Sequence, residues 1–188
     1  MEKILQNKLK PEETLLWTGK PGEFTTLDNT HKSAIMKKCI VVAIAVVAVL
    51  AAYIAYVTTH GHAVNAVMIV LALGVGAFGM SGDFTMANKL RNKTLYALTD
   101  MRLIVVTGGH FEAVPYENVE SYEFVTDEDG HLSLICGDTP KNESSRMRRT
   151  ATVRGAVNDT ENGRCHSFAM YALEDVDAVK KILAKYMA

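Results

Sequence analysis

Charged residues are missing from a long stretch of this 188-residue chain, and cysteines are few throughout it. After Lys37 and Lys38, no Asp, Glu, Lys or Arg occurs up to residue 80. The cysteines form no Cys-x-x-Cys pair, which argues against both a zinc site and a disulfide framework; they are Cys39, Cys136 and Cys165. The uncharged stretch is therefore the feature that decides the class of protein.

Two apolar segments fill this stretch. The first, residues 36–59, contains CIVVAIAVVAVLAAYIAYV and is long enough, at ~1.5 Å per residue, to cross ~30 Å of hydrocarbon. The second, residues 62–80, is shorter and richer in glycine, but its closeness to the first makes it the returning span. The amino terminus, MEKILQNKLKPEE, lacks the apolar core of a signal peptide. The sequence therefore predicts a transmembrane helical hairpin over residues 36–80.

Basic residues flank the hairpin on one side only. The connecting turn has no Lys or Arg, whereas both outer flanks carry them: Lys32, Lys37 and Lys38 before the first span, and Lys89, Arg91 and Lys93 after the second. Because Lys and Arg near span ends are retained in the cytoplasm, we expect both termini to be cytoplasmic and the chain to be integral to the cytoplasmic (inner) membrane.

Small residues recur at helical spacing in both spans. They are Ala45, Ala48, Ala52 and Ala55 in the first span, and Ala72, Gly76 and Gly79 in the second. Small residues let helices approach closely in lipid. We expect the two stripes to pack against each other and close the hairpin; the other interpretation is an interface between copies of the chain.

Ionisable side chains are absent from both spans, which removes most of the support for a transporter or a channel. His60 and His62 near the turn form a His-x-His pair. With no third ligand nearby in the sequence, we expect an interfacial turn and no metal site.

Residues 94–188 alternate apolar and polar side chains, as half-buried strands do. Strands are expected at 95–98, 102–107 and 110–114, around Tyr122 and Phe124, at 132–136, and at about 150–157 and 164–170. Asp129-Gly130 predicts a two-residue hairpin turn with positive φ at both residues, at a solvated tip. A closing amphipathic helix is expected from the spacing of Val176, Val179, Leu183 and Tyr186.

The remaining segments flank the hairpin. Residues 1–35 are expected to form a cytoplasmic segment with a strand-like element at 12–21, in which Trp17 fills the core of the β-domain. Residues 81–93 are expected to be a juxtamembrane linker. The predicted architecture is thus an α+β membrane protein with a two-helix hairpin and an antiparallel β-domain that ends in a helix.

Three stretches carry a resemblance to a known family. YALTDMRLIVV (96–106), PYENV (115–119), and Phe168 followed by Asp175 and its helix are similar to the bacterial pleckstrin-homology-like (PH) domains of small membrane proteins. EETLLWTGKP (12–21) resembles the element that precedes the hairpin in the two-span form. The resemblance covers most of the chain in order, and implies a PH-like β-barrel or sandwich capped by the C-terminal helix at the inner membrane surface.

A basic stretch from Gly137 to Arg154 departs from that family pattern. Five cations stand against Asp138 and Glu143, a local charge of 5 − 2 = +3; they are Lys141, Arg146, Arg148, Arg149 and Arg154. One interpretation is that these side chains bind lipid headgroups or an acidic partner, because each cation near an anionic leaflet gains about 1 kcal/mol. The other is a flexible, solvated loop.

Other functions have little support in the sequence. From residue 94 onwards ten Lys and Arg face fifteen Asp and Glu, a net charge of 10 − 15 = −5, which disfavours nucleic acid. No catalytic motif appears, so we expect no enzyme and no cofactor, and we interpret His110, His131 and His166 as surface residues. The sequence predicts a membrane-anchored binding or scaffolding module that contacts lipid or a protein partner. The alternative is a subunit of a homo-oligomer or of a larger membrane assembly.

Overall fold

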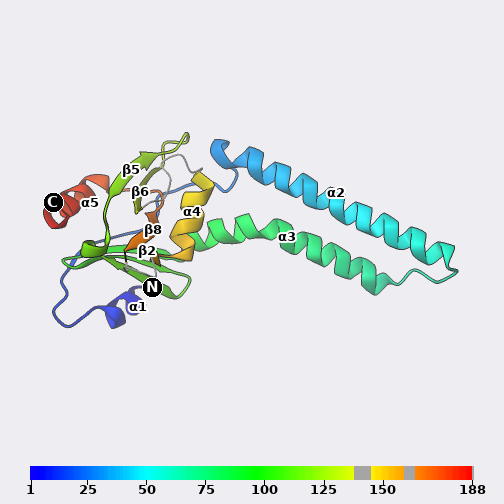
Figure 1. Cartoon of the computed structure of the whole chain (residues 1–188), viewed down its shortest axis with the longest axis horizontal. Helices are drawn as coiled ribbons and strands as arrows, with labels where there is room; N and C mark the ends of the chain where they lie inside the picture. The colour runs from blue at the N-terminus through cyan, green and yellow to red at the C-terminus, as the bar shows by residue number, and fades with distance from the viewer. Residues whose placement is uncertain (138–144, 159–163, 188) are drawn as a thin grey trace.

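The computed structural model describes residues 1–137, 145–158 and 164–187 of the chain. Two long helices extend from a domain of β-strands and short helices (Figure 1). In chain order the elements are α1 (Glu2–Lys8), β1 (Leu15–Gly19), α2 (Asn29–Thr59), α3 (Ala66–Asn92), β2 (Thr94–Thr99), β3 (Arg102–Thr107), β4 (His110–Pro115), the 3-10 turn η1 (Tyr116–Asn118), β5 (Tyr122–Thr126), β6 (Leu132–Cys136), α4 (Ser145–Arg154), β7 (Val157–Asn158), β8 (Cys165–Met170) and α5 (Val176–Tyr186).

The two long helices α2 and α3 form an antiparallel hairpin (Figure 1). Among the described residues, these two helices are long and apolar enough to cross a membrane. Most of their apolar side chains face outwards, as Val75 and Phe78 do with 72% and 83% of their surface exposed. Such exposure is unfavourable in water and favourable in lipid. The sequence prediction of two membrane-compatible helices is therefore confirmed.

The hairpin closes through valines of α2 against the glycine face of α3. A Cβ atom added at Gly76 would lie 2.6 Å from Cγ2 of Val46, so only glycine fits at this crossing. Gly79 faces Val42 less closely, because an added Cβ would lie 3.7 Å from Cγ1, an ordinary van der Waals distance. Ala72, Gly76 and Gly79 all line the groove between the two helices.

The alanine stripe of α2 does not meet that face. Ala48, Ala52 and Ala55 are exposed, and Ala45 reaches only the edge of the groove between the helices. The expectation that the two small-residue stripes pack against each other is wrong for α2. The reason is steric, because the valine side chains of α2 fill the space that the missing side chain of Gly76 leaves open.

Both helices continue beyond the apolar spans towards the domain. Helix α2 begins at Asn29 rather than at residue 36, and α3 runs to Asn92, so the expected linker at 81–93 is helical almost throughout. We call residues 29–38 and 83–92 the hairpin base. Lys38 Nζ donates to Asp83 Oδ2 at 2.8 Å, an ion pair that links the two helices where their apolar parts end.

Among the residues that the structure describes, eight strands form two four-stranded antiparallel sheets rather than a closed barrel, in the orders β1-β2-β3-β4 and β5-β6-β8-β7. Strand β1 pairs with β2, with Trp17 opposite Leu98. Strand β1 lies within the range 12–21 in which a strand-like element was expected. Gly22 N donates to Ala172 O at 2.6 Å, which joins the segment after β1 to the end of β8. We call these strands, together with α1, α4 and α5, the sheet domain.

The core of the sheet domain lies between the two sheets and under α5. Val179 and Leu183 of α5 are fully buried there, and Trp17 packs against the same cluster as expected. Tyr96 is also fully buried and donates through its hydroxyl to Tyr171 O at 2.7 Å. Burial raises the pKa of Tyr96 well above its ordinary value, although this hydrogen bond acts in the opposite direction.

A buried carboxylate fixes the chain before β1. Glu13 accepts two hydrogen bonds from Arg102, each of 2.7 Å, and one from the Thr99 hydroxyl at 2.8 Å. Burial alone would raise the pKa of Glu13, but these hydrogen bonds outweigh it and lower the pKa to about 2. The carboxylate therefore stays ionised and holds the N-terminal segment on the first sheet.

Two local predictions in the second sheet are wrong. Residues 145–154 form α4, where a strand was expected at about 150–157, and only Val157–Asn158 pairs as β7. The hairpin between β5 and β6 exists, but only Gly130 has positive φ, at 83°. Gly130 N donates to Asp127 O and Asp127 N to His131 O, so the turn is longer than the two residues expected.

Candidate functional site

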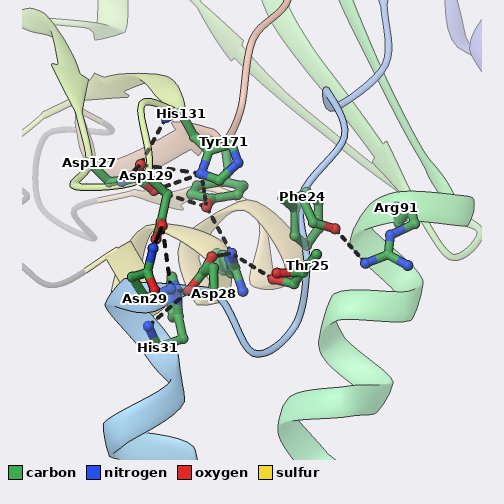
Figure 2. A network of polar contacts seen from close by, with 11 residues as sticks. Phe24, Thr25, Asp28, Asn29, His31, Arg91, Asp127, Asp129, His131 and Tyr171 are labelled. Carbon is green, nitrogen blue, oxygen red and sulfur yellow. Dashed lines mark hydrogen bonds and ion pairs between the residues drawn. The ribbon is translucent and has the colours of Figure 1, made fainter.

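In the described part of the chain, several buried and half-buried polar side chains gather where the hairpin enters the sheet domain (Figure 2). We call it the polar joint, and define it as Phe24, Asp28, His31, Asp127, His131, Arg149 and Tyr171. These residues come from the segment before α2, from α2, α4, the β5–β6 turn and the end of β8. A site built from so many segments fixes their relative positions.

Asp28 is the residue on which the joint is centred. It caps the N-terminus of α2, where its Oδ1 accepts from His31 N at 2.9 Å, as aspartate commonly does. The same oxygen lies 2.5 Å from Nδ1 of His31, a side chain that is only 2% exposed. The Asp28 carboxylate, whose side chain is only 5% exposed, requires a cationic partner.

Arg149 of α4 supplies that partner. Its Nη2 donates to Asp28 Oδ2, and the same nitrogen donates to Thr25 O at 3.3 Å and to the Tyr171 hydroxyl at 2.9 Å. The side chain is 4% exposed in the ion pair. Removal of either partner would leave the other charge buried and uncompensated, which is strongly unfavourable.

Aromatic rings enclose the guanidinium of Arg149. Its Cζ lies 4.5 Å from the ring centroid of Phe24 and 4.8 Å from that of Tyr171, within the range of cation–π attraction. The two rings meet edge to face, with 5.3 Å between their centroids. From α3, Arg91 donates to Phe24 O at 2.5 Å (Figure 2). Helix α3 of the hairpin thus contacts the backbone of this aromatic pair.

The β5–β6 turn completes the joint. The Tyr171 hydroxyl donates to Asp127 Oδ2 at 3.0 Å, and Nδ1 of His131 lies 3.2 Å from that oxygen. Asp129 Oδ1 accepts from the side-chain amide of Asn29 at 3.0 Å (Figure 2). The turn is therefore attached to the first residue of α2, and the tip predicted to be solvated is in large part a contact surface.

Apolar side chains seal the inner side of the joint. Leu90 of α3 is fully buried against Phe24, Tyr171 and Ala172. Ala172 has φ of 55°, a left-handed conformation that costs an alanine roughly 1–2 kcal/mol. The surrounding contacts must outweigh this cost, which indicates that the backbone beside Tyr171 is firmly held.

A cavity of about 630 Å³ opens on the outer side of the joint. Its lining combines acids, one arginine, one histidine and an aromatic ring: Glu23, Phe24, Thr25, Asp28, Arg91, Asp129 and His131. Such a cavity suits a small polar group or the side chain of a partner protein. A cavity of this size and mixed charge is compatible with several classes of ligand.

The titratable side chains of the joint lie in pairs. Two His–Asp pairs are present, His31 with Asp28 and His131 with Asp127, and such a pair can act as a general base. In the hydrogen bonds of the described residues, however, neither histidine contacts a serine or cysteine nucleophile. The described residues also contain no cluster of three potential metal ligands.

The structure places the described cations of the basic stretch in different environments. Arg148 and Arg149 are buried, at 6% and 4% exposure, and Arg149 is held in the ion pair described above. The expectation that these two arginines reach lipid headgroups, or lie in a solvated loop, is wrong. Arg154 is exposed at the end of α4. Lys141 and the side chain of Arg146 lie outside the described part of the chain.

Sequence reasoning missed most of the joint. Asp28, His31, Asp127 and Tyr171 drew no functional prediction, and His131 was interpreted as a surface residue although it is partly buried beside Asp127. One signal was present in the sequence. Leu27-Asp28-Asn29-Thr30 is a helix N-cap pattern, and it would have moved the start of α2 upstream of residue 36.

Comparisons of the chain with protein-family models, with curated proteins and with solved structures find no match.

Proposed function

We propose that this chain is a membrane-anchored binding or scaffolding module, whose hairpin crosses the inner membrane and holds the sheet domain at the cytoplasmic face. Two observations support membrane insertion: the outward-facing apolar side chains of α2 and α3, and the position of the Lys38–Asp83 pair at the end of the apolar parts. Basic residues follow on the hairpin base, which supports cytoplasmic termini.

The observation that carries the proposal is the polar joint. A tether that only localises a domain needs no buried ion pair, whereas here Asp28, Arg149 and Tyr171 fix the domain on the helices. Such a connection favours a module that presents one defined surface to a protein partner. The PH-like character of the sheet domain belongs to the same proposal, and rests on the motifs at 96–106 and 115–119.

The alternative is a subunit of a homo-oligomer or of a larger membrane assembly. One observation favours it, which is that Ala48, Ala52 and Ala55 remain exposed on α2. An exposed stripe of small residues suits a close helix–helix contact in lipid. A monomer in mild detergent would support the recruiting module, whereas a defined multimer would support the assembly.

The topology of the proposal can be tested with single cysteines in intact cells. Ala184→Cys places a thiol on an exposed position of α5, and His62→Cys places one in the turn of the hairpin. Both variants are made in a Cys39→Ala background. Only Cys39 needs to be replaced, because the two other thiols, those of Cys136 and Cys165, are buried and react poorly. Burial raises the pKa of the Cys165 thiol to about 11, and burial raises that of Cys136 further.

A membrane-impermeant maleimide should label His62→Cys in cells whose outer permeability barrier is open to the reagent. It should label Ala184→Cys only after the inner membrane is lysed. Labelling of both positions before lysis, or of Ala184→Cys alone, would refute the proposed orientation. Release of the chain by alkaline carbonate would refute membrane insertion altogether.

A further inference from the structure

Helix α4 has two unlike faces, and their arrangement is the reverse of an ordinary surface helix. Arg148, Arg149 and Thr152 are buried, at 6%, 4% and 1% exposure, and face the sheet domain. Thr152 Oγ1 accepts from Tyr171 N at 3.2 Å, which orients this face towards β8. The opposite face turns outwards and carries Met147, which is 47% exposed, and Arg154.

The outward face forms one continuous strip. Residues 147, 151 and 154 are spaced by four and three positions, so they align on one side of a helix with 3.6 residues per turn. The strip consists of an exposed methionine, a half-buried alanine and an exposed arginine. An apolar centre with a cation at one end suits the boundary between lipid headgroups and water.

The position of α4 relative to the hairpin gives its depth. Figure 1 shows α4 crossing the hairpin at its base, close to both helices. Thr150 Oγ1 lies 3.4 Å from Sδ of Met86 in α3. Met86 is three residues beyond Asp83, so it lies about 5 Å below the Lys38–Asp83 pair along the helix axis. A headgroup layer is roughly 5–7 Å thick on each side of the hydrocarbon.

The charge of the hairpin base matches an anionic surface at this depth. Exposed cations surround the base on both helices, and they are Lys32, Lys37, Lys89 and Arg91. Arg154 extends this set from α4. The ion pair with Asp28 accounts for the inward position of Arg149, but exposure of Met147 to open water brings no gain, whereas a lipid surface accepts the methionine.

We infer that α4 is an interfacial helix, whose strip of Met147, Ala151 and Arg154 contacts the anionic headgroup layer of the membrane in which the hairpin sits. The inference rests on the proposed membrane insertion. It assigns the lipid contact of the basic stretch to a different set of side chains from the buried Arg148 and Arg149. The contact of α4 with the headgroups would be a third point of attachment to the membrane, besides the two helices of the hairpin. It would therefore limit the tilt of the sheet domain relative to the bilayer.

Spin-label accessibility of the full chain in nanodiscs tests this inference. Single labels are placed by Met147→Cys, Met101→Cys and Val75→Cys in the Cys39→Ala background. Met101 is a matched control, because it is 43% exposed and lies in the turn at the far end of β2 from the hairpin. Val75 is 72% exposed in α3 and reports on the hairpin itself. The measured quantity is the accessibility to oxygen relative to that to a polar nickel chelate.

In nanodiscs with about one third anionic phosphatidylglycerol, the ratio at residue 147 should lie clearly above that at 101 and below that at 75. Adding Arg154→Glu should move the ratio at 147 towards that at 101. In all-phosphatidylcholine nanodiscs, the ratio at 147 should fall as well, because the electrostatic attraction is lost.

Two results would overturn the inference. A ratio at 147 equal to that at 101 in both lipids would place α4 in water. A label at 147 that is shielded from both reagents would place a protein surface, such as a second copy, over this strip. The label at 75 separates this failure from that of the proposed function, because water-like accessibility at 75 would mean that the hairpin itself is not in the bilayer.

Discussion

Replacing Arg149 by methionine should destabilise the sheet domain more than any exposed substitution in α4. Arg149→Met keeps much of the side-chain length but leaves Asp28, which is 8% exposed, without its cationic partner. Breaking a buried ion pair in this way costs about 3–5 kcal/mol. For a chain of this size each kcal/mol lowers the unfolding midpoint by about 2–4 °C, so we expect a decrease of about 6–20 °C.

Thermal unfolding in a neutral detergent, followed by the fluorescence of Trp17, measures this change. Trp17 is the only tryptophan of the chain and packs against the core of the sheet domain. Arg154→Met is the matched control on the same helix, because that arginine is exposed and its loss should cost less than about 0.5 kcal/mol. Neutral detergent excludes any contribution from anionic lipid.

The double variant Asp28→Asn with Arg149→Met tests the mechanism. Asparagine keeps the N-cap of α2 but removes the buried charge, so the double variant should recover part of the stability lost by Arg149→Met alone. If Arg149→Met unfolds at the same temperature as Arg154→Met, the polar joint does not stabilise the domain. A double variant less stable than Arg149→Met would show that the cost does not arise from the charge of Asp28.

Two further predictions concern the hairpin and the first sheet. Disulfide cross-linking between Val42→Cys and Gly79→Cys measures how closely α2 and α3 approach. Gly76→Leu should slow this cross-linking, because the new side chain clashes with Val46. Gly74→Leu is the control and should leave the rate unchanged, because no atom lies within 4 Å of a Cβ added at Gly74. Glu13→Gln should remove a stabilisation of about 3 kcal/mol that is present above pH 4.5 and lost towards pH 2, because the folded pKa is about 2 against an ordinary 4.5. Equal acid unfolding curves for Glu13→Gln and the parent chain would contradict this account.

The elements that the sequence predicts well are those whose signal is local. Strands β2, β3 and β4 lie where their strand-forming residues and the Gly108-Gly109 turn predict them, and both glycines have positive φ. The expectation of half-buried strands is wrong for β2 and β3, because both of their faces are covered. Helix α5 follows from its apolar spacing, which places Val179 and Leu183 in the core. In α5, the burial pattern and the chemical pattern of the side chains coincide.

Helix α4 was missed because the two patterns are opposed there. Its arginines read as a solvated loop, yet Arg148 and Arg149 are buried and Met147 is exposed. Only the ion pair with Asp28, 121 residues away in sequence, makes burial of Arg149 acceptable. A contact of this range leaves no periodic trace in a single sequence.

The limits of the hairpin were misplaced for a related reason. Charged residues end the apolar runs near residues 38 and 83, but they do not end the helices, which continue to Asn29 and Asn92. The continuation depends on partners outside the helices, such as Asp129 for Asn29 and Tyr171 for the segment around Leu90. Those partners belong to strands and turns far along the chain.

The unbroken helical passage from α3 to β2 has a consequence for how the molecule meets others. With the hairpin inserted as proposed, no flexible linker separates α3 from the sheet domain, so the domain would keep a narrow range of orientations relative to the bilayer. Copies of the chain that diffuse laterally in one bilayer would then meet with the same orientation relative to the membrane normal. Two copies that meet would differ mainly in their rotation about the membrane normal. Fewer relative orientations would have to be sampled before two complementary surfaces come into contact.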